Sequence, residues 1–110
     1  MEKEIDFQTR VKVYDQAIDT FGVDKQLVVA VEELSELQKE VCKALRYEKN
    51  AINEAHMAEE IADVMIMVEQ LQRIFQIGEL VETYRSKKIR RLAKKLDMQF
   101  VEDSPIDGDL

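Results

Sequence analysis

Apolar residues recur every three or four positions along most of the chain, and no stretch shows the sustained alternation of a β-strand. This spacing is typical of amphipathic α-helices, and it predicts helices over about residues 6–21, 24–47, 53–77 and 79–97. Gly22 and Gly78 are predicted to end the first and third helices, because glycine readily adopts left-handed backbone conformations. Asp24 is predicted to cap the start of the second. The pattern therefore predicts an all-α fold.

Each of the two central helices has an apolar face. In the second helix it comprises Leu27, Ala30, Val31, Leu34, Leu37, Val41 and Leu45, and in the third Met57, Ile61, Val64, Met65, Val68, Leu71 and Phe75. Short connections favour antiparallel neighbours, so a compact four-helix bundle is expected. Val28, Val29, Ile66 and Met67 widen these faces, and a small bundle gains by covering them. We therefore expect a homodimer or homotetramer.

Length and composition limit the protein to one ordinary domain. The chain has 110 residues, of which 45% are hydrophobic and 35% charged. We expect a helical domain over residues 1–101 and a mobile acidic tail over residues 102–110. The apolar runs are far too short to span a membrane, and the charged amino end does not resemble a signal peptide. With a single cysteine, Cys42, these features predict a cytoplasmic protein without membrane contact.

The net charge is -7, but the last predicted helix is basic, since seven of the eleven residues 85–95 are lysine or arginine. An acidic protein with one basic helix does not resemble a nucleic-acid binder, so no nucleic acid polymer is expected as a partner. Tyr84, Lys88 and Arg91 lie along one face of that helix, and Lys88 and Arg91 are candidates for binding phosphates. The alternative is a solvated helix whose basic end complements the helix dipole.

Two acidic pairs border the apolar faces of the central helices: Glu33 with Glu36, and Glu60 with Asp63. If these helices pack antiparallel, the four carboxylates converge, and their mutual repulsion then favours a bound cation. An oxygen-only site suits Mg²⁺, Mn²⁺ or Ca²⁺ and suits structural zinc poorly, and we expect Mg²⁺, with Mn²⁺ as a substitute. Single acidic pairs at this spacing usually lie on solvated surfaces, and it is the combination of two pairs on neighbouring helices that favours a metal site.

The acidic strings carry a resemblance to a known family. Glu-Glu-Leu-Ser-Glu-Leu (residues 32–37) and Glu-Glu-Ile-Ala-Asp-Val (residues 59–64) resemble the helices of the MazG-like all-α nucleoside triphosphate pyrophosphohydrolases. The resemblance implies Mg²⁺-dependent hydrolysis of a nucleoside triphosphate to monophosphate and pyrophosphate by a metal-activated water. It implies that Glu33, Glu36, Glu60 and Asp63 are metal ligands and that Glu32 orients a ligand or a water. Glu32 and Glu36 are the candidate catalytic residues.

Other polar residues and other functions also bear on this hypothesis. Gln26 precedes Glu33 by seven residues, shares its face, and is a candidate for binding the base or sugar. His56 is typical of a surface or capping residue. A non-catalytic helical interaction module remains the alternative function. A di-iron bundle needs Glu-x-x-His elements, which Glu54-Ala55-His56 does not provide.

Overall fold

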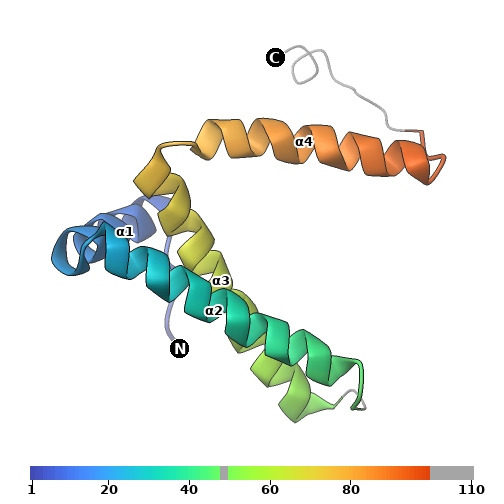
Figure 1. Ribbon diagram of the computed structural model, residues 1–110, viewed down its shortest axis with the longest axis horizontal. Coiled ribbons are helices and arrows are strands. Elements are labelled where there is room, and N and C mark those ends of the chain that lie inside the picture. Colours follow the sequence, from blue (N-terminus) through green and yellow to red (C-terminus); the bar gives the residue numbers. More distant parts are fainter. Residues whose placement is uncertain (48–49, 100–110) are drawn as a thin grey trace. The chain divides into compact units, whose positions relative to one another are not determined.

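The computed structural model describes residues 1–47 and 50–99, and over these ranges it contains four α-helices and no strand. The helices are α1 (Phe7–Phe21), α2 (Val23–Ala44), α3 (Ala51–Phe75) and α4 (Gly78–Lys95) (Figure 1). The predicted all-α fold is confirmed. None of these helices is long and apolar enough to cross a membrane. The predicted acidic tail, residues 102–110, lies outside the described residues.

The helix starts follow ordinary capping chemistry. The Asp6 carboxylate accepts a hydrogen bond of 2.8 Å from the Thr9 N–H, and the Asn50 side chain accepts one of 2.9 Å from the Asn53 N–H. Each of these side chains satisfies a backbone donor that the first helical turn leaves unpaired. Gly22 lies between α1 and α2 with φ of 93°, a conformation that strains any residue with a Cβ. The predicted stop at Gly22 is therefore confirmed.

Two predicted helix boundaries are wrong, the start of the second helix and the end of the third. Helix α2 already begins at Val23, so Asp24 lies in its first turn, where its charge complements the helix dipole without capping the helix. Gly78 does not end the third helix but begins α4. The chain leaves α3 two residues earlier, because Gln76 adopts the left-handed conformation (φ 56°, ψ 46°) and its N–H bonds to the Arg73 carbonyl.

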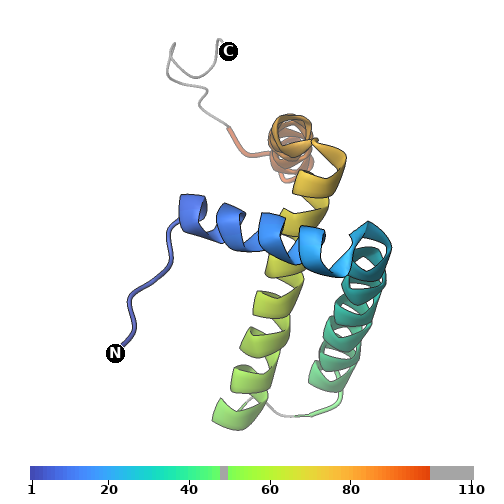
Figure 2. The ribbon, with the colours of Figure 1, turned by 90° about the vertical axis from the view of Figure 1, so that its left-hand side faces the viewer.

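The chain divides into two compact units, Met1–Gln76 and Ile77–Leu110. In the first unit α2 and α3 lie side by side and run antiparallel, and α1 runs across both (Figure 2). The second unit contains α4, in which Ala93 is buried. Packing of all four helices into one bundle stays a prediction.

The interior of the first unit is partly polar. Its buried residues are Tyr14, Ala30, Met67, Gln26 and Gln70. The Gln26 amide nitrogen donates a hydrogen bond of 2.8 Å to the Gln70 side-chain oxygen, which joins α2 to α3. Because both amides are buried, this bond satisfies groups that would otherwise be costly to remove from water.

Helix α1 is held on α3 by charged groups. The Glu69 carboxylate accepts hydrogen bonds from the Tyr14 hydroxyl and from two nitrogens of the Arg10 guanidinium. One turn further along α3, Arg73 forms an ion pair of 2.8 Å with Asp15. Burial, followed by the hydrogen bond to Glu69, raises the pKa of Tyr14 to about 12, so Tyr14 stays a hydroxyl donor at neutral pH.

The predicted inward faces of the central helices are only partly correct. On α2, Ala30 is buried and Leu37 half-buried, but Val31, Leu34 and Val41 are exposed, as is Leu45 just after the helix. On α3, Ile61, Met65, Val68 and Phe75 are likewise exposed. The less exposed positions of α2 follow the line of Gln26, Ala30, Glu33, Leu37 and Glu40. The contact between the helices is therefore rotated toward the acidic residues, which leaves an apolar stripe exposed on each helix.

Candidate metal centre

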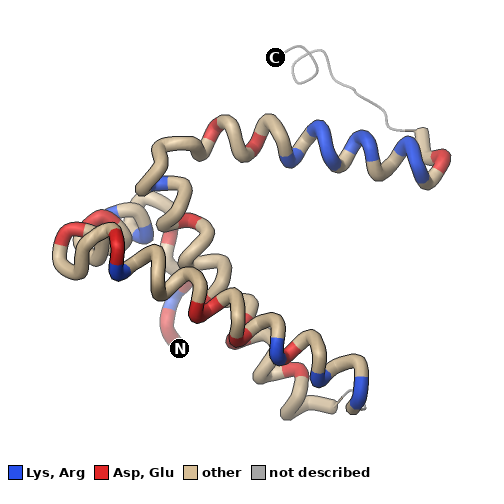
Figure 3. The backbone as a smooth tube through the Cα atoms, in the orientation of Figure 1, with Lys and Arg blue, Asp and Glu red and all other residues tan. Residues whose placement is uncertain are grey.

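The structure brings carboxylates from α2 and α3 together. Glu33 on α2 and Glu60 and Asp63 on α3 each have a side-chain oxygen within 4.8 Å of the others, and all three residues are half-buried. Acidic residues gather on the adjoining stretches of both helices (Figure 3). The antiparallel pairing explains this, because equal steps along the helices in opposite directions lead from Gln26 opposite Gln70 to Glu33 opposite Asp63.

The charges at this cluster repel one another. Burial, followed by the negative charges of Asp63, Glu60 and Glu36, raises the pKa of Glu33 above its ordinary value of 4.5. Burial and then Asp63 and Glu36 raise the pKa of Glu60 in the same direction. Both carboxyl groups therefore hold a proton more tightly than free glutamate does, and a cation would relieve the same repulsion.

Glu36, the fourth predicted ligand, lies beside this cluster. It is exposed and forms an ion pair of 3.3 Å with Lys39, one turn along α2. Its charge nevertheless contributes to the raised pKa of both Glu33 and Glu60. Three of the four predicted ligands thus have oxygens within one site, and Glu36 is within electrostatic reach of it.

The donor set fits a small hard cation. Mg²⁺ takes oxygen ligands at about 2.1 Å in octahedral geometry, so opposite ligands on one ion lie about 4.2 Å apart. Adjacent ligands lie only about 3 Å apart, so the three carboxylate oxygens, which lie within 4.8 Å of one another, must draw closer by up to about 2 Å to share one ion. Acidic groups also gather in proteins that bind no cation.

The remaining predicted site residues are placed as follows. Glu32 is exposed on α2, whereas Gln26 is buried with its amide bonded to Gln70. Tyr84, Lys88 and Arg91 are exposed on α4, in the second unit, where basic residues predominate (Figure 3). Their assignments to catalysis or substrate binding stay predictions.

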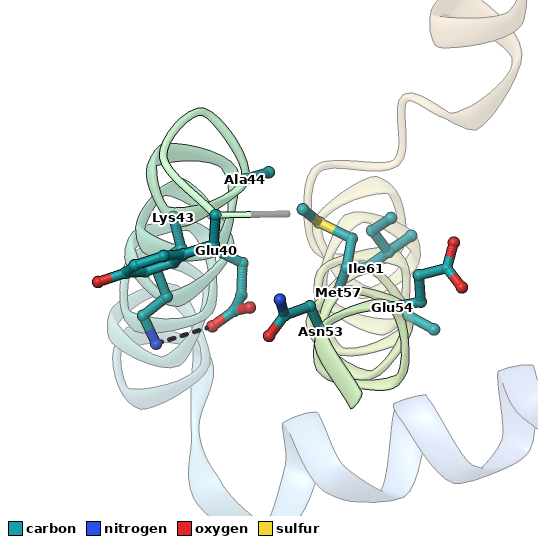
Figure 4. A pocket seen from close by; sticks show the side chains of 9 residues that line it. Glu40, Lys43, Ala44, Asn53, Glu54, Met57 and Ile61 are labelled. Carbon is teal, nitrogen blue, oxygen red and sulfur yellow. Dashed lines mark hydrogen bonds and ion pairs between the residues drawn. The ribbon is translucent and has the colours of Figure 1, made fainter. Parts of the chain in front are cut away.

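A pocket that the sequence patterns did not predict lies in the hairpin of α2 and α3. Its volume is about 460 Å³, and it is lined by Glu40, Lys43, Ala44, Tyr47, Asn53, Glu54, Met57, Ala58 and Ile61 (Figure 4). Glu40 lines the pocket and its charge helps raise the pKa of Glu60, so the pocket lies near the acidic cluster. Glu40 was missed as a site residue although it follows Glu36 by one turn and Glu33 by two, a spacing that places all three on one face.

Comparisons with known proteins give no relative. No protein-family model, no curated protein and no solved structure matches this chain. The likeness to MazG-like enzymes therefore depends only on the two acidic strings in residues 32–37 and 59–64.

Proposed function

We propose that the protein is a Mg²⁺-dependent nucleotide pyrophosphohydrolase of MazG-like type, which converts a nucleoside or deoxynucleoside triphosphate to the monophosphate and pyrophosphate. The observation that supports it best is the convergence of Glu33, Glu60 and Asp63 from two antiparallel helices. Carboxylates so placed are unfavourable without a cation, and a Mg²⁺ site of few carboxylates typically also binds phosphates.

The acidic residues have two roles in the proposed reaction. Glu33, Glu60 and Asp63, with Glu36 beside them, hold the cation, and Mn²⁺ can replace Mg²⁺. The bound cation offsets phosphate charge and lowers the pKa of a coordinated water. Glu32 and Glu36 are exposed and do not belong to the three-residue cluster, so either can orient that water or accept its proton.

The pocket next to the cluster accommodates the rest of the substrate. A triphosphate held at the carboxylates places its nucleoside in the adjoining space, where Met57, Ala58 and Ile61 provide apolar surface and Tyr47 an aromatic ring. Pockets of this kind, mostly apolar with a few polar groups, are typical of small-molecule sites. The proposed substrate is therefore a complete nucleotide and not inorganic triphosphate.

The deciding experiment is an assay with a panel of nucleoside triphosphates, in Mg²⁺ and in chelator, with products separated by chromatography. Monophosphate and pyrophosphate, formed only with Mg²⁺, are expected. Diphosphate and phosphate as products would contradict the proposal, as would activity that survives the chelator.

Glu60→Gln should lower turnover by more than about 100-fold, because loss of even an indirect partner of a metal site costs about 10- to 100-fold. The matched control is Glu59→Gln, since Glu59 is the neighbouring acid on α3 and is exposed outside the cluster. Circular dichroism should show both variants folded. Full activity in Glu60→Gln, or equal losses in the two variants, would contradict the assignment.

The alternative function is a helical interaction module without catalysis. In that case the acidic residues are simply solvated, and Mg²⁺ leaves the thermal unfolding temperature unchanged. The pyrophosphohydrolase predicts the opposite, because a ligand that binds only the folded state raises its stability, by about 2.7 kcal/mol at a concentration 100 times Kd.

A further inference from the structure

Glu40 is the charged residue that the structure places most directly in the pocket. Its side chain is only 13% exposed, although Lys43, its ion-pair partner at 3.2 Å, is 52% exposed. Figure 4 shows Glu40 reaching from α2 toward α3, whereas Glu54 points away from α2. The wall around Glu40 includes Ala44 and Met57. A carboxylate in such surroundings needs hydrogen-bond donors, because burial without them is costly.

Lys43 occupies only one oxygen of this carboxylate. The lysine ammonium bonds to Glu40 Oε2, and Oε1 makes no hydrogen bond to any residue that the structure describes. A ligand in the pocket can therefore donate to Glu40 without breaking the ion pair. Carboxylate oxygens form stronger hydrogen bonds than neutral acceptors do.

The distance from the acidic cluster indicates which part of a nucleotide Glu40 meets. In the register that sets Glu33 opposite Asp63, Glu60 lies opposite Glu36. Glu40 therefore lies one helical turn, about 6 Å at 1.5 Å per residue, beyond the level of Glu60, and two turns, about 10 Å, beyond Glu33. Its charge is also among those that raise the pKa of Glu60. The sugar is the first group beyond the α-phosphate, and the base follows it. A nucleotide with its phosphates at the cluster thus places its sugar by Glu40 and its base toward Tyr47.

We propose that Glu40 is a specificity-determining residue whose carboxylate accepts hydrogen bonds from the hydroxyl groups of the nucleotide sugar. This inference rests on the proposed function, because the cluster must hold the phosphates. Carboxylates bind ribose hydroxyls in the same way in dinucleotide-binding folds. The resemblance to MazG-like enzymes does not include Glu40, which lies outside both acidic strings.

The test compares each nucleoside triphosphate with its 2′,3′-dideoxy analogue, which keeps the phosphates and base but lacks both hydroxyls. In the wild-type protein the analogue should have a kcat/KM lower by about 10- to 100-fold, the value of a hydrogen bond to a charged group. In Glu40→Met this difference, the dideoxy penalty, should disappear, because the kcat/KM for the ordinary substrate falls to that for the analogue. If Glu40 had only a structural role, the substitution would lower kcat/KM for both substrates by the same factor and leave the ratio between them unchanged.

Glu59→Met is the matched control. Glu59 and Glu40 both raise the pKa of Glu60 by their charge, but Glu59 does not line the pocket, so its loss should leave the dideoxy penalty intact. If Glu40→Met does not fold, Glu40→Gln keeps the size and one neutral acceptor, and its penalty should be smaller than that of the wild type.

An unchanged penalty in the folded Glu40 variant overturns the proposal, as does a wild-type protein that does not distinguish the two substrates. In both cases hydrolysis of the ordinary triphosphate still supports the proposed function. A wild-type protein that hydrolyses neither substrate overturns the proposed function itself, together with this inference.

Discussion

At the scale of single residues, the fold raises the pKa of two carboxyl groups, those of Glu33 and Glu60. Burial and the neighbouring carboxylates raise the pKa of both above 4.5, so the folded state binds their protons more tightly than the unfolded state. Stability from these groups is therefore present at low pH and is lost as the pH rises through the raised values. Asp15 and Glu69 behave oppositely, because arginine partners lower their pKa values.

We expect the unfolding temperature to depend on pH in chelator, and we expect bound Mg²⁺ to remove this dependence. In chelator, the unfolding temperature should rise as the pH is lowered from neutral through the raised pKa values of Glu33 and Glu60, which lie above 4.5. Below about pH 4 it should fall again, as Asp15 and Glu69 lose their ion pairs. Thermal unfolding followed by circular dichroism at a series of pH values measures both effects.

Glu60→Gln is the variant that tests the origin of this dependence. It removes a carboxyl group whose pKa the fold raises and should therefore flatten this rise. Glu59→Gln should flatten it less, because Glu59 lies outside the cluster and contributes to the raised pKa of Glu60 only after Asp63 and Glu36. An identical rise in wild type and Glu60→Gln would show that the acidic cluster is not its source.

At the scale of elements, the pairing of α2 with α3 decides where the carboxylates meet. The buried bond between Gln26 and Gln70 lies two turns from the pair of Glu33 and Asp63, in the same antiparallel register. Sliding one helix by a turn would separate the two amides and leave them buried without each other. A buried polar pair can specify register in this way, as polar core residues do in coiled coils.

Substitution of both residues of this pair should cost less stability than substitution of one. Gln26→Leu leaves the Gln70 amide buried without its donor, and we expect a loss of about 1–3 kcal/mol in the free energy of unfolding. Gln26→Leu with Gln70→Leu replaces both amides by apolar groups of similar size and should recover most of that loss. Urea unfolding provides the measurement, with Gln16→Leu, at an exposed position of α1, as control. Additive losses in the double variant would contradict a coupled pair.

At the scale of the whole molecule, the exposed apolar stripes of α2 and α3 are the dominant feature. On α2, Val31 is 63% exposed and Leu34 is 50% exposed, and on α3 Met65 is 61% exposed. Large contiguous apolar surfaces are uncommon on monomers and mark interaction sites. We propose that a second copy of the chain covers these stripes, as a homodimer or within a homotetramer.

Light scattering coupled to size-exclusion chromatography should accordingly give a mass of two or four chains. Met65→Glu places a charge in the apolar stripe of α3 and should shift the protein toward smaller species, since burying an unpaired charge is costly. Ala55→Glu adds the same charge at an exposed position outside that stripe and should not. A monomeric wild-type protein at micromolar concentration would rule out this assembly.

Much of the local structure could be predicted from the order of residues alone. The all-α fold and the break at Gly22 depend on short-range spacing and on the conformations that single residues allow. The encounter of Glu33 with Glu60 and Asp63 was also predictable, because two acidic pairs on antiparallel neighbours converge in only a few arrangements. The prediction that Gly78 ends the third helix was wrong, because α3 already ends before Gln76, which adopts the left-handed conformation.

What the tertiary structure decided was the rotation of the central helices about their axes and the space this leaves between them. Helical periodicity defines a face but not the angle at which a neighbour meets it, and α2 meets α3 along Gln26, Ala30 and Glu33 and not along Val31 and Leu34. The same rotation brings Glu40 into a pocket. Such outcomes depend on how many side chains pack and pair at once, which no single stretch of sequence contains.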